Sequence, residues 1–505
     1  MQRALPLHAR NSRWKAEVHT HDAGQFDLSD AVVSASTRKS LSEPAGVFTM
    51  TLKPSARPGG EGVDLLSQIR DDDWVLMGAT DADGADWLSM TGLVDGVRRQ
   101  RVGTAGSTTY TVRGRDLGKV MLKTDMLDMP WLGISTKNDI LVIAASAVKW
   151  AVDALGKNAT PGRVLDVLVR FTLGDGKYRG RSQLWAVPPS FRLNPPPGKD
   201  PVDPLIRQVS DVLSLQHIDL TTEGVLPSML ALPTGFSGGG SLWALLQQYG
   251  NPLINEIVVD DIPVSGAESS PTAFVIGTGA DGATRSHPSI RVRQKPFPSL
   301  AYGGSAWDAL PANEFPESDL EAYDVERSGA ERFEWFAADS ALGPELMHTA
   351  MGALMDGTVP EDKLWDAHPA LFPLSIERHG LSRFQQPTPY LDPSAEESAY
   401  LATKWAHLLR DWYAPNPVFL SGTATVAYLC PGVRVGERLR VHLRGGEVEE
   451  FYIEAVEHRF AKRPDGSAHG STNLSITRGW RLPDVRTEYS KSVLRWLNDN
   501  LEVMV

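Results

Sequence analysis

The chain is nearly free of cysteine, with Cys430 alone among 505 residues. It therefore cannot form a disulfide within itself or hold a cysteine-based zinc cluster. Cys430 is expected to be a small buried apolar residue, which fits a protein that folds in a reducing compartment.

Long apolar runs are also absent. No uncharged apolar stretch reaches about 18 residues, so no membrane span is expected. The first 15 residues lack the apolar segment of a secretory signal, so none is expected there. Basic residues are fewer than acidic ones, 50 against 62, and the net charge of −12 argues against wrapping nucleic acid by phosphate neutralisation.

The composition that remains is that of folded soluble domains, with 42% hydrophobic and 22% charged residues. The length predicts roughly three or four domains, and the fold class is α+β, mainly β. Strands are expected at 254–260, 272–276 and 289–293. We divide the chain into a first β domain (1–125), a helical insert with a Pro-rich loop (126–235), an α+β middle domain (236–390), a helix with a second β domain (391–482) and a C-terminal helix (483–505).

Alternation of apolar and polar residues is clearest near the two ends. Residues 48–52 alternate strictly, which predicts a strand with one buried face. Residues 438–444 ("RLRVHLR") alternate as well, and Gly445-Gly446 predicts a tight turn into a return strand. The hairpin should have one core face and one wet face, where its arginines pair with Glu447, Glu449 and Glu450 rather than read nucleic acid.

A weaker likeness links the two ends. Arg113-Gly114 and Arg478-Gly479 each follow an alternating stretch, and each pair is expected to form a turn where its strand ends. The two end domains thus share a rough plan.

One glycine motif suggests a nucleotide site. Gly277, Gly279 and Gly282 have the spacing of a dinucleotide-binding turn. Such a turn should be followed by a helix, but residues 290–293 alternate like a strand. An acidic residue should also stand about 20 residues after the last glycine, but that position is Tyr302. A plain connection between strands is favoured, and a nucleotide-binding module stays an alternative.

Other candidate sites are equally weak. The "DADGAD" stretch (81–86) resembles half a calcium loop, but Met90 stands where a bidentate Glu is needed, so a hairpin turn is favoured. His19 and His21 lack a third ligand nearby, and residues 71–73 are expected to be a solvated acidic turn. The sequence has no nucleophile elbow, zinc-protease or phosphate-loop motif. No catalytic, cofactor-binding or metal residue is predicted, and the chain is not expected to be an enzyme.

The order of the segments resembles one known family. The C-terminal part carries most of the likeness, in "ATKWAHLLRDWYAPNP", "LSGTATV", "PGVRVGERLRV", "EFYIEAVEHRF" and "STNLSITRG", and the N-terminal part adds "GVFTMTL", "LLSQIRDDDWVLM" and "TYTVRGRDLGKVML". These segments resemble the baseplate hub, or late control D-like, proteins of bacteriophage tails, which are similar to the N-terminal part of type VI secretion spike proteins. Residues 126–235 depart most from the family.

The resemblance implies two tube-type β-barrel domains near the two ends with α/β insert domains between them. It implies a homotrimer whose six barrels form a pseudo-sixfold ring, adapting the sixfold tail tube to a threefold central spike and forming part of the DNA channel. Implied partners are the spike, tail tube and tape-measure proteins, the baseplate wedge or sheath-initiator proteins, and DNA in transit without specific binding. The expected location is the virion tail baseplate, assembled in the host cytoplasm. Three chains would carry a charge of −36 (3 × −12), so an acidic channel lining that repels phosphates is expected.

Three other functions are weighed against the phage hub. The hub of a phage-derived contractile injection or secretion particle would use the same plan. A spike protein would continue into a β-helical needle, and no such repeat occurs before the expected helix at the end of the sequence. The third alternative is a tail-associated cell-wall hydrolase, and no cluster of catalytic residue types in the sequence supports it.

Overall fold

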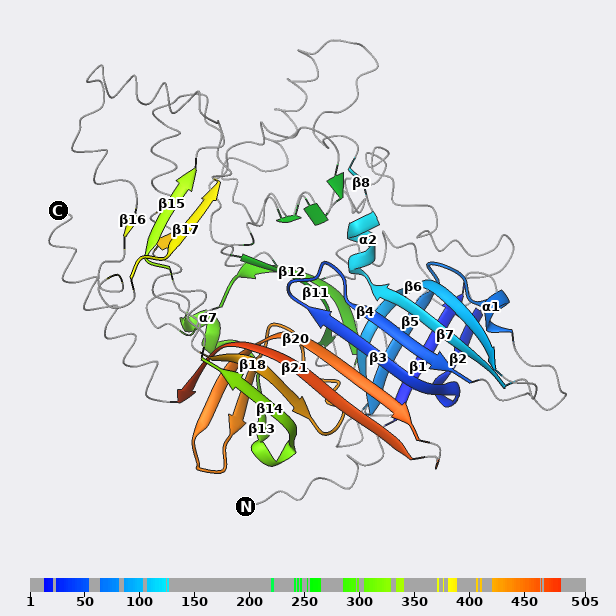
Figure 1. The fold of residues 1–505 in the computed structure, drawn as a ribbon. Helices are drawn as coiled ribbons and strands as arrows, with labels where there is room; N and C mark the ends of the chain where they lie inside the picture. Colours follow the sequence, from blue (N-terminus) through cyan, green and yellow to red (C-terminus); the bar gives the residue numbers. More distant parts are fainter. Residues whose placement is uncertain are drawn as a thin grey trace, which may run out of the picture.

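The computed structural model describes about half of the chain. The described ranges, apart from a few single positions, are residues 13–20, 24–53, 64–80, 86–102, 107–123, 125–126, 219–221, 240–241, 255–264, 285–296, 304–327, 333–339, 370–371, 380–387, 420–463 and 467–482. Strands dominate these ranges, which confirms the mainly β fold class (Figure 1). Outside them lie the helices predicted in 126–235 and 483–505, the strand predicted at 272–276 and most of the helix predicted at the start of 391–482.

The first β unit is formed by strands β1 to β7. Phe48, Met50 and Leu52 point into its core from alternate positions of β4, as the sequence pattern predicts. Two short helices accompany the strands. The bounds are β1 (Trp14–Thr20), β2 (Gly24–Asp27), β3 (Val32–Ser40), β4 (Val47–Leu52), α1 (Leu65–Gln68), β5 (Trp74–Thr80), β6 (Asp86–Val102), β7 (Ser107–Asp116) and α2 (Gly118–Lys123).

The second β unit has its own core, which includes Leu439, Val441 and Phe451. Its strands are β13 (Ala312–Pro316), β14 (Leu320–Glu326), β18 (Leu420–Val426), β19 (Arg438–His442), β20 (Val448–Lys462) and β21 (Ala468–Leu482). Strand β13 pairs in parallel with β19, and β14 pairs antiparallel with β18. These two strands come from the range assigned to the middle domain, whose boundaries stay a prediction.

The two units are joined edge to edge. Strand β3 of the first unit pairs antiparallel with β20 of the second, from Ser34 opposite Ala461 to Ser40 opposite Ala455. We call this β3–β20 pairing the seam. Through it both units belong to one 13-stranded sheet with the main order β14-β18-β21-β20-β3-β4-β7-β6-β5-β1-β2. In Figure 1 the second unit (orange and red) lies to the left of the first (blue and cyan).

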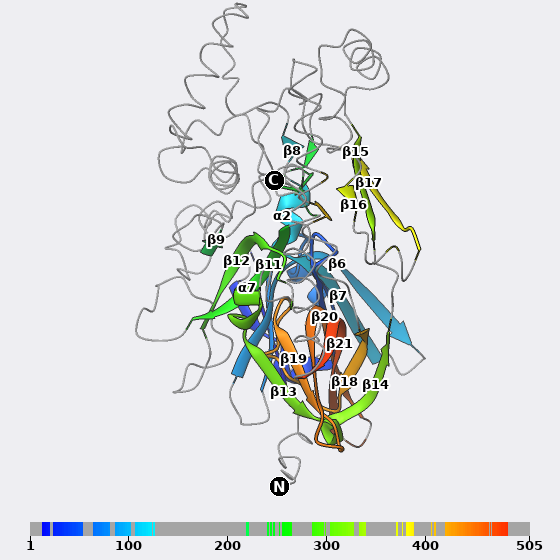
Figure 2. The same ribbon diagram turned by 90° about the vertical axis from the view of Figure 1, so that its left-hand side faces the viewer.

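The remaining elements are smaller. Strands β11 (Asn255–Val264) and β12 (Arg285–Gln294) form a long antiparallel hairpin, which confirms the strands predicted near 254–260 and 289–293. The sheet of β15 to β17 stands apart from the large sheet in both views (Figures 1 and 2). The other bounds are β8 (Asp125–Met126), β9 (Asp219–Thr221), β10 (Gly240–Ser241), α7 (Gly304–Asp308), β15 (Trp335–Asp339), β16 (Ala370–Leu371) and β17 (Arg383–Pro387), with single 3-10 turns at Ser29–Ala31 and Glu317–Asp319. Among the helices of the described ranges, none is long and apolar enough to cross a membrane.

The two Arg-Gly pairs occupy matching places in the two units. Gly114 lies within β7 and Gly479 within β21, so the expectation of turns at strand ends is wrong. Each glycine faces a phenylalanine ring of its own unit, Phe48 or Phe451. A Cβ at Gly114 would stand 2.5 Å from the Phe48 ring, and one at Gly479 would stand 2.2 Å from the Phe451 ring. Glycine is needed because the ring takes the space of a side chain.

Candidate functional site: the seam and its two faces

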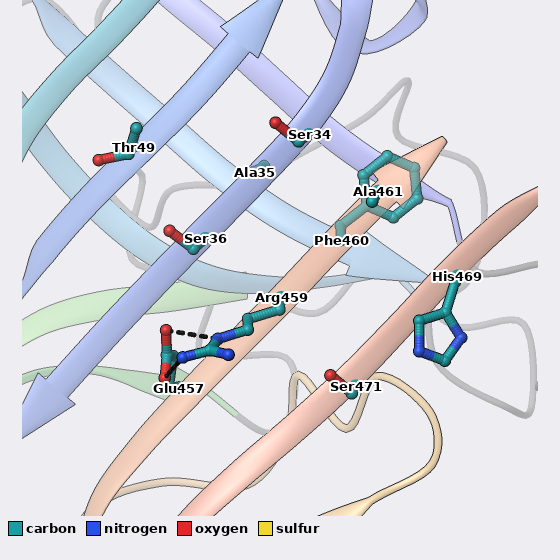
Figure 3. A pocket seen from close by; sticks show the side chains of 10 residues that line it. All are labelled: Ser34, Ala35, Ser36, Thr49, Glu457, Arg459, Phe460, Ala461, His469 and Ser471. Atoms are coloured by element: carbon teal, nitrogen blue, oxygen red, sulfur yellow. Dashed lines mark hydrogen bonds and ion pairs between the residues drawn. The ribbon is translucent and has the colours of Figure 1, made fainter. Parts of the chain in front are cut away.

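The outer face of the seam is polar. Directly opposed residues of an antiparallel pair share a face, so Ser34, Ser36 and Arg38 of β3 lie beside Ala461, Arg459 and Glu457 of β20. The flanking strands β4 and β21 continue this face with Thr49 and Ser471. A shallow hollow runs over these four strands, with the side chains shown in Figure 3.

The same face extends across the whole row of eight strands from β14 to β6, because the pairing registers keep matching residues on one side. Hydroxyls are its most frequent kind of side chain, and we call it the hydroxyl face. Its exposed or half-buried serines and threonines are Ser34, Ser36, Ser40, Thr49, Thr51, Thr109, Thr111, Ser421, Thr423, Thr425, Ser471 and Ser475.

Three arginines of the hydroxyl face are paired with carboxylates. Arg459 donates to both carboxylate oxygens of Glu457, at 2.7 and 2.9 Å, as the dashed lines in Figure 3 mark. Arg38 lies 3.2 Å from Glu43. Arg115 lies 2.8 Å from Asp95 in a two-pronged contact. These arginines therefore present little unbalanced positive charge to a polyanion.

The inner side of the seam holds a buried lysine. Lys39 lies on β3 between two outward-facing neighbours and is 8% exposed. Its Nζ lies 2.7 Å from Asp260 Oδ1, 3.1 Å from Asp261 Oδ2 and 3.8 Å from Asp116 Oδ2. A buried ammonium requires such counter-charges because burial strips its hydration.

Arg434 completes this group from the second unit. It donates to the carbonyls of Leu88, at 2.5 Å, and Ser89, at 3.4 Å, both in β6 of the first unit. Its Nη1 also lies 3.8 Å from Asp260 Oδ1. We call Lys39, Asp116, Asp260, Asp261 and Arg434 the buried charge cluster. It ties the first unit, the β11–β12 hairpin and the second unit together.

The pKa values in this region follow from burial and from the neighbouring charges. Burial lowers the pKa of Lys39, but the three carboxylates outweigh it and hold this pKa above its ordinary value. Burial raises the pKa of Asp116 to about 7, although the Lys39 charge opposes that rise. For Asp260, the charges of Lys39 and Arg434 overcome burial and lower its pKa. A lysine held protonated in this way offers no free amine for nucleophilic catalysis.

His458, on the inner side of β20, borders the same cluster. Burial and the charge of Arg434 lower its pKa to about 3, so its ring is neutral at physiological pH. The ring Nδ1 lies 3.1 Å from Thr472 Oγ1. Its partner in the seam register is Thr37.

A second set of polar contacts fixes the β11–β12 hairpin to the second unit. Arg293 donates to Glu256 at 2.7 Å, to the Gly436 carbonyl at 2.7 Å and to the Tyr452 hydroxyl at 3.1 Å. The Tyr452 hydroxyl also donates to Glu256. The hairpin is thus anchored to each β unit by at least one charged side chain.

The β19–β20 hairpin carries the predicted charge pairing at Glu450, whereas Glu447 and Glu449 pair with Arg481 of β21. Arg440 donates to Glu450 at 2.5 Å. The expectation of a wet face is wrong at Arg438 and Glu450, since both are buried and Glu450 is only 1% exposed. Trp307 of α7 covers them and donates its indole N–H to Glu450 at 2.8 Å. That cover comes from a segment more than 100 residues away in the sequence.

The acidic stretch 71–73 begins as the expected turn with Asp71 exposed, but the rest of it is not solvated. Asp72 and Asp73 are buried, and Asp72 lies 2.5 Å from the fully buried ammonium of Lys119. Lys119 also contacts Asp95, at 2.9 Å, and the Val94 carbonyl, at 2.7 Å. Sequence inspection missed both buried lysines. The only signal for Lys39 is its place in the alternation of β3, since Ala35, Thr37 and Lys39 fall on one face.

The weaker sequence motifs form no ligand site in the described part of the chain. The three glycines at 277, 279 and 282, His21 and residues 81–85 lie outside the described residues. Thr80 pairs with Asp86 across the antiparallel β5–β6 strands, as a hairpin requires. His19 is buried beside Glu17, and Cys430 is a buried thiol. Within the described ranges no group of three or more His, Cys, Asp or Glu residues could hold a metal ion.

No protein-family model matches the chain, and no curated protein matches it. Solved structures do match. A tail protein from Neisseria meningitidis MC58 is 12% identical with a TM-score of 0.44, over 92% of this chain and 96% of that one. The 43 kDa tail protein of prophage MuSo2 from Shewanella oneidensis is 11% identical with a TM-score of 0.43, over 92% and 98%. A lidded PdpA-VgrG complex from Francisella is 5% identical with a TM-score of 0.40, over 93% of this chain and 53% of that one. These three solved structures are thus two tail proteins, one of them from a prophage, and a VgrG complex.

Proposed function

We propose that the chain is the structural hub of a phage tail baseplate, a trimer that adapts the sixfold tail tube to a threefold central spike. The observation that carries the proposal is the hydroxyl face: two β units, each with its own core, share a row of eight antiparallel strands with a continuous polar surface. Two barrels per chain are what a trimer needs to present six similar units to a sixfold tube. The sequence resemblance supplies the biological setting.

The hydroxyl face has the chemistry of a channel wall for DNA in transit. Each phosphate neutralised by an unpaired lysine or arginine adds affinity, and a conduit has to avoid that gain. Arg38, Arg115 and Arg459 are each held by a carboxylate, which reduces the attraction of the face for phosphates. Within the described residues only Arg98 and Arg113 add exposed arginines to this face without an ion pair. We therefore propose a channel wall of hydroxyls and largely paired charges in place of the acidic lining expected from the net charge. Such groups bind water but bind DNA phosphates only weakly.

The partners follow from the position of such a ring. One rim would meet the central spike and the other the tail tube, while the tape-measure protein would occupy the channel before ejection. Baseplate wedge or sheath-initiator proteins would contact the outside. The location is the virion tail baseplate, after assembly in the host cytoplasm. A phage-derived injection particle would use the same ring.

Electron microscopy of the purified chain, alone and with its spike, tests the proposal. We expect a ring of about 165 kDa (3 × 55.1 kDa) with a central pore, formed by the chain alone or once the spike is added. A high-resolution map should place Thr49 and Ser471 on the pore wall. A chain that stays monomeric with and without the spike would contradict the hub.

A further inference from the structure

A small cavity lies on the inner side of the seam, where the first β unit, the β11–β12 hairpin and the second β unit meet. Its volume is about 10 Å³. A cavity needs about 10–15 Å³ to hold one water molecule, so this one has room for a single water and for nothing larger. The residues that line it are Thr37, Lys39, Ser89, Asp260, Val433, Arg434, Val435, Val456 and His458.

Most of the cavity wall is polar, and four buried side-chain atoms on it have no hydrogen-bond partner among the described residues. They are Thr37 Oγ1, Ser89 Oγ, Asp260 Oδ2 and Arg434 Nε. The four residues are between 2% and 4% exposed, so bulk water does not serve these atoms. Buried polar atoms in folded proteins are paired with protein groups or with ordered water, because leaving them unpaired is costly. Four such atoms around one cavity therefore indicate a partner inside it.

The charges on the wall argue against an ion as that partner. A cation would lie against the ammonium of Lys39 and the guanidinium of Arg434, and an anion would lie against the carboxylate of Asp260. The ionised Asp260 Oδ2 only accepts hydrogen bonds, whereas Arg434 Nε–H only donates one. The partner must therefore be a small neutral molecule that both donates and accepts, and water meets each requirement.

We propose that one water molecule is bound in this cavity and links the three parts of the chain that form its wall. It accepts a hydrogen bond from Arg434 Nε–H of the second unit and donates one to Asp260 Oδ2 of the hairpin. The hydroxyls of Thr37 and Ser89 from the first unit supply its other two bonds, one as donor and one as acceptor. Buried waters make about two to four such bonds. The site goes beyond the proposed function and does not require the ring.

The water completes the hydrogen bonding of two oppositely charged side chains in the buried charge cluster. Asp260 Oδ1 is already taken by Lys39 at 2.7 Å. The terminal nitrogens of Arg434 already donate to the carbonyls of Leu88 and Ser89. A water between the two atoms that are left, Asp260 Oδ2 and Arg434 Nε, keeps both charges fully hydrogen-bonded where bulk solvent does not reach.

A high-resolution crystal structure of the full chain tests the site directly. We expect one ordered water peak within hydrogen-bond distance of Asp260 Oδ2, of Arg434 Nε and of at least one of the two hydroxyls. The alternative is a dry cavity, in which small shifts pair the four polar atoms with one another. A cavity without a water peak, or a peak with the short contact distances of a metal ion, would overturn the proposal.

Magnetic relaxation dispersion of oxygen-17 water gives an independent test, because it counts long-lived water molecules in solution. The variant Thr37→Val with Ser89→Val removes both hydroxyls and adds apolar volume to the cavity wall. We expect it to contain one long-lived water fewer per chain than the wild type. The matched control is Thr111→Val with Ser475→Val, which makes the same changes on the hydroxyl face and should keep the wild-type count.

Thermal unfolding shows whether each variant folds. If the buried double variant does not fold, Thr37→Val alone keeps the shape of the side chain and removes one partner of the water. The residence time of one long-lived water should then become shorter than in the wild type. An unchanged count in the folded double variant, or an unchanged residence time in Thr37→Val, would overturn the proposal.

Discussion

Lys39 and Asp260 are 221 positions apart in the sequence, and the lysine Nζ lies 2.7 Å from the aspartate Oδ1. The contact joins the first β unit to the β11–β12 hairpin at the back of the seam. Both side chains are buried, so neither has water to replace its partner. The placement of the β11–β12 hairpin against the first β unit therefore depends on this charge pair.

Replacing Lys39 by methionine keeps the length of the side chain and removes its charge. Asp260 and Asp261 would then be buried without their main counter-ion, and we expect unfolding stability to fall by about 3–5 kcal/mol. The control is Arg38→Met, because the neighbouring arginine forms an exposed pair with Glu43 and should contribute at most about 1 kcal/mol. Urea unfolding of both variants gives the comparison. Equal losses would show that the buried charge has no special role.

The pKa of Asp116 predicts one pH dependence. The folded-state pKa of about 7 lies above the ordinary 3.8, so between these values the folded chain binds more protons than the unfolded one. The folding stability that Asp116 contributes is fully present below pH 4 and is lost as the pH rises through 7. The stability difference between wild type and Asp116→Asn should therefore fall from pH 4 to 7. A difference that stays flat in thermal melts would refute this assignment.

The lowered pKa of His458 predicts the opposite dependence of stability on pH. Its folded-state pKa of about 3 lies below the ordinary 6.5, so the unfolded chain binds more protons between these values. Its contribution is present above pH 6.5 and is lost as the pH falls towards 3. The stability difference between wild type and His458→Gln should rise across that window. Melts of His469→Gln, an exposed histidine on β21, should follow the wild type at every pH.

The matching glycines should both be intolerant of a methyl group. A Cβ at Gly114 would stand 2.2 Å from the Leu93 carbonyl oxygen, which is backbone and cannot move aside cheaply. We expect Gly114→Ala and Gly479→Ala each to cost about 1–3 kcal/mol. Gly445→Ala has open space within 4 Å and should change stability by about 0.5 kcal/mol or less. Thermal unfolding that ranks Gly445→Ala with the other two would contradict the packing explanation.

Arg434→Lys tests the link between the two units. Lysine keeps the charge but lacks the fork that reaches both the Leu88 and Ser89 carbonyls, so about 1–3 kcal/mol should be lost. Protease cleavage of the native chain should become faster because the units separate more often. The exposed Arg459→Lys serves as the matched control. Unchanged cleavage in Arg434→Lys would show that the seam alone holds the units together.

The sequence by itself determined the strands and their inner faces. Alternation at residues 48–52 and 438–443 predicts which side chains enter a core, because a strand has a period of two and needs no other information. Phe48, Met50, Leu439 and Val441 are buried accordingly. The cross-strand pairing of Arg440 with Glu450 also follows from the local turn.

Only the tertiary structure decided which charged side chains are buried. Asp72 was expected in a solvated turn, yet it is paired with Lys119 of α2, a helix that follows three strands later in the chain. Glu450 was expected on a wet face, yet Trp307 covers it. The seam and the buried charge cluster likewise join segments far apart in sequence. Periodicity describes one segment at a time, whereas the burial of a charge depends on which distant segment packs against it.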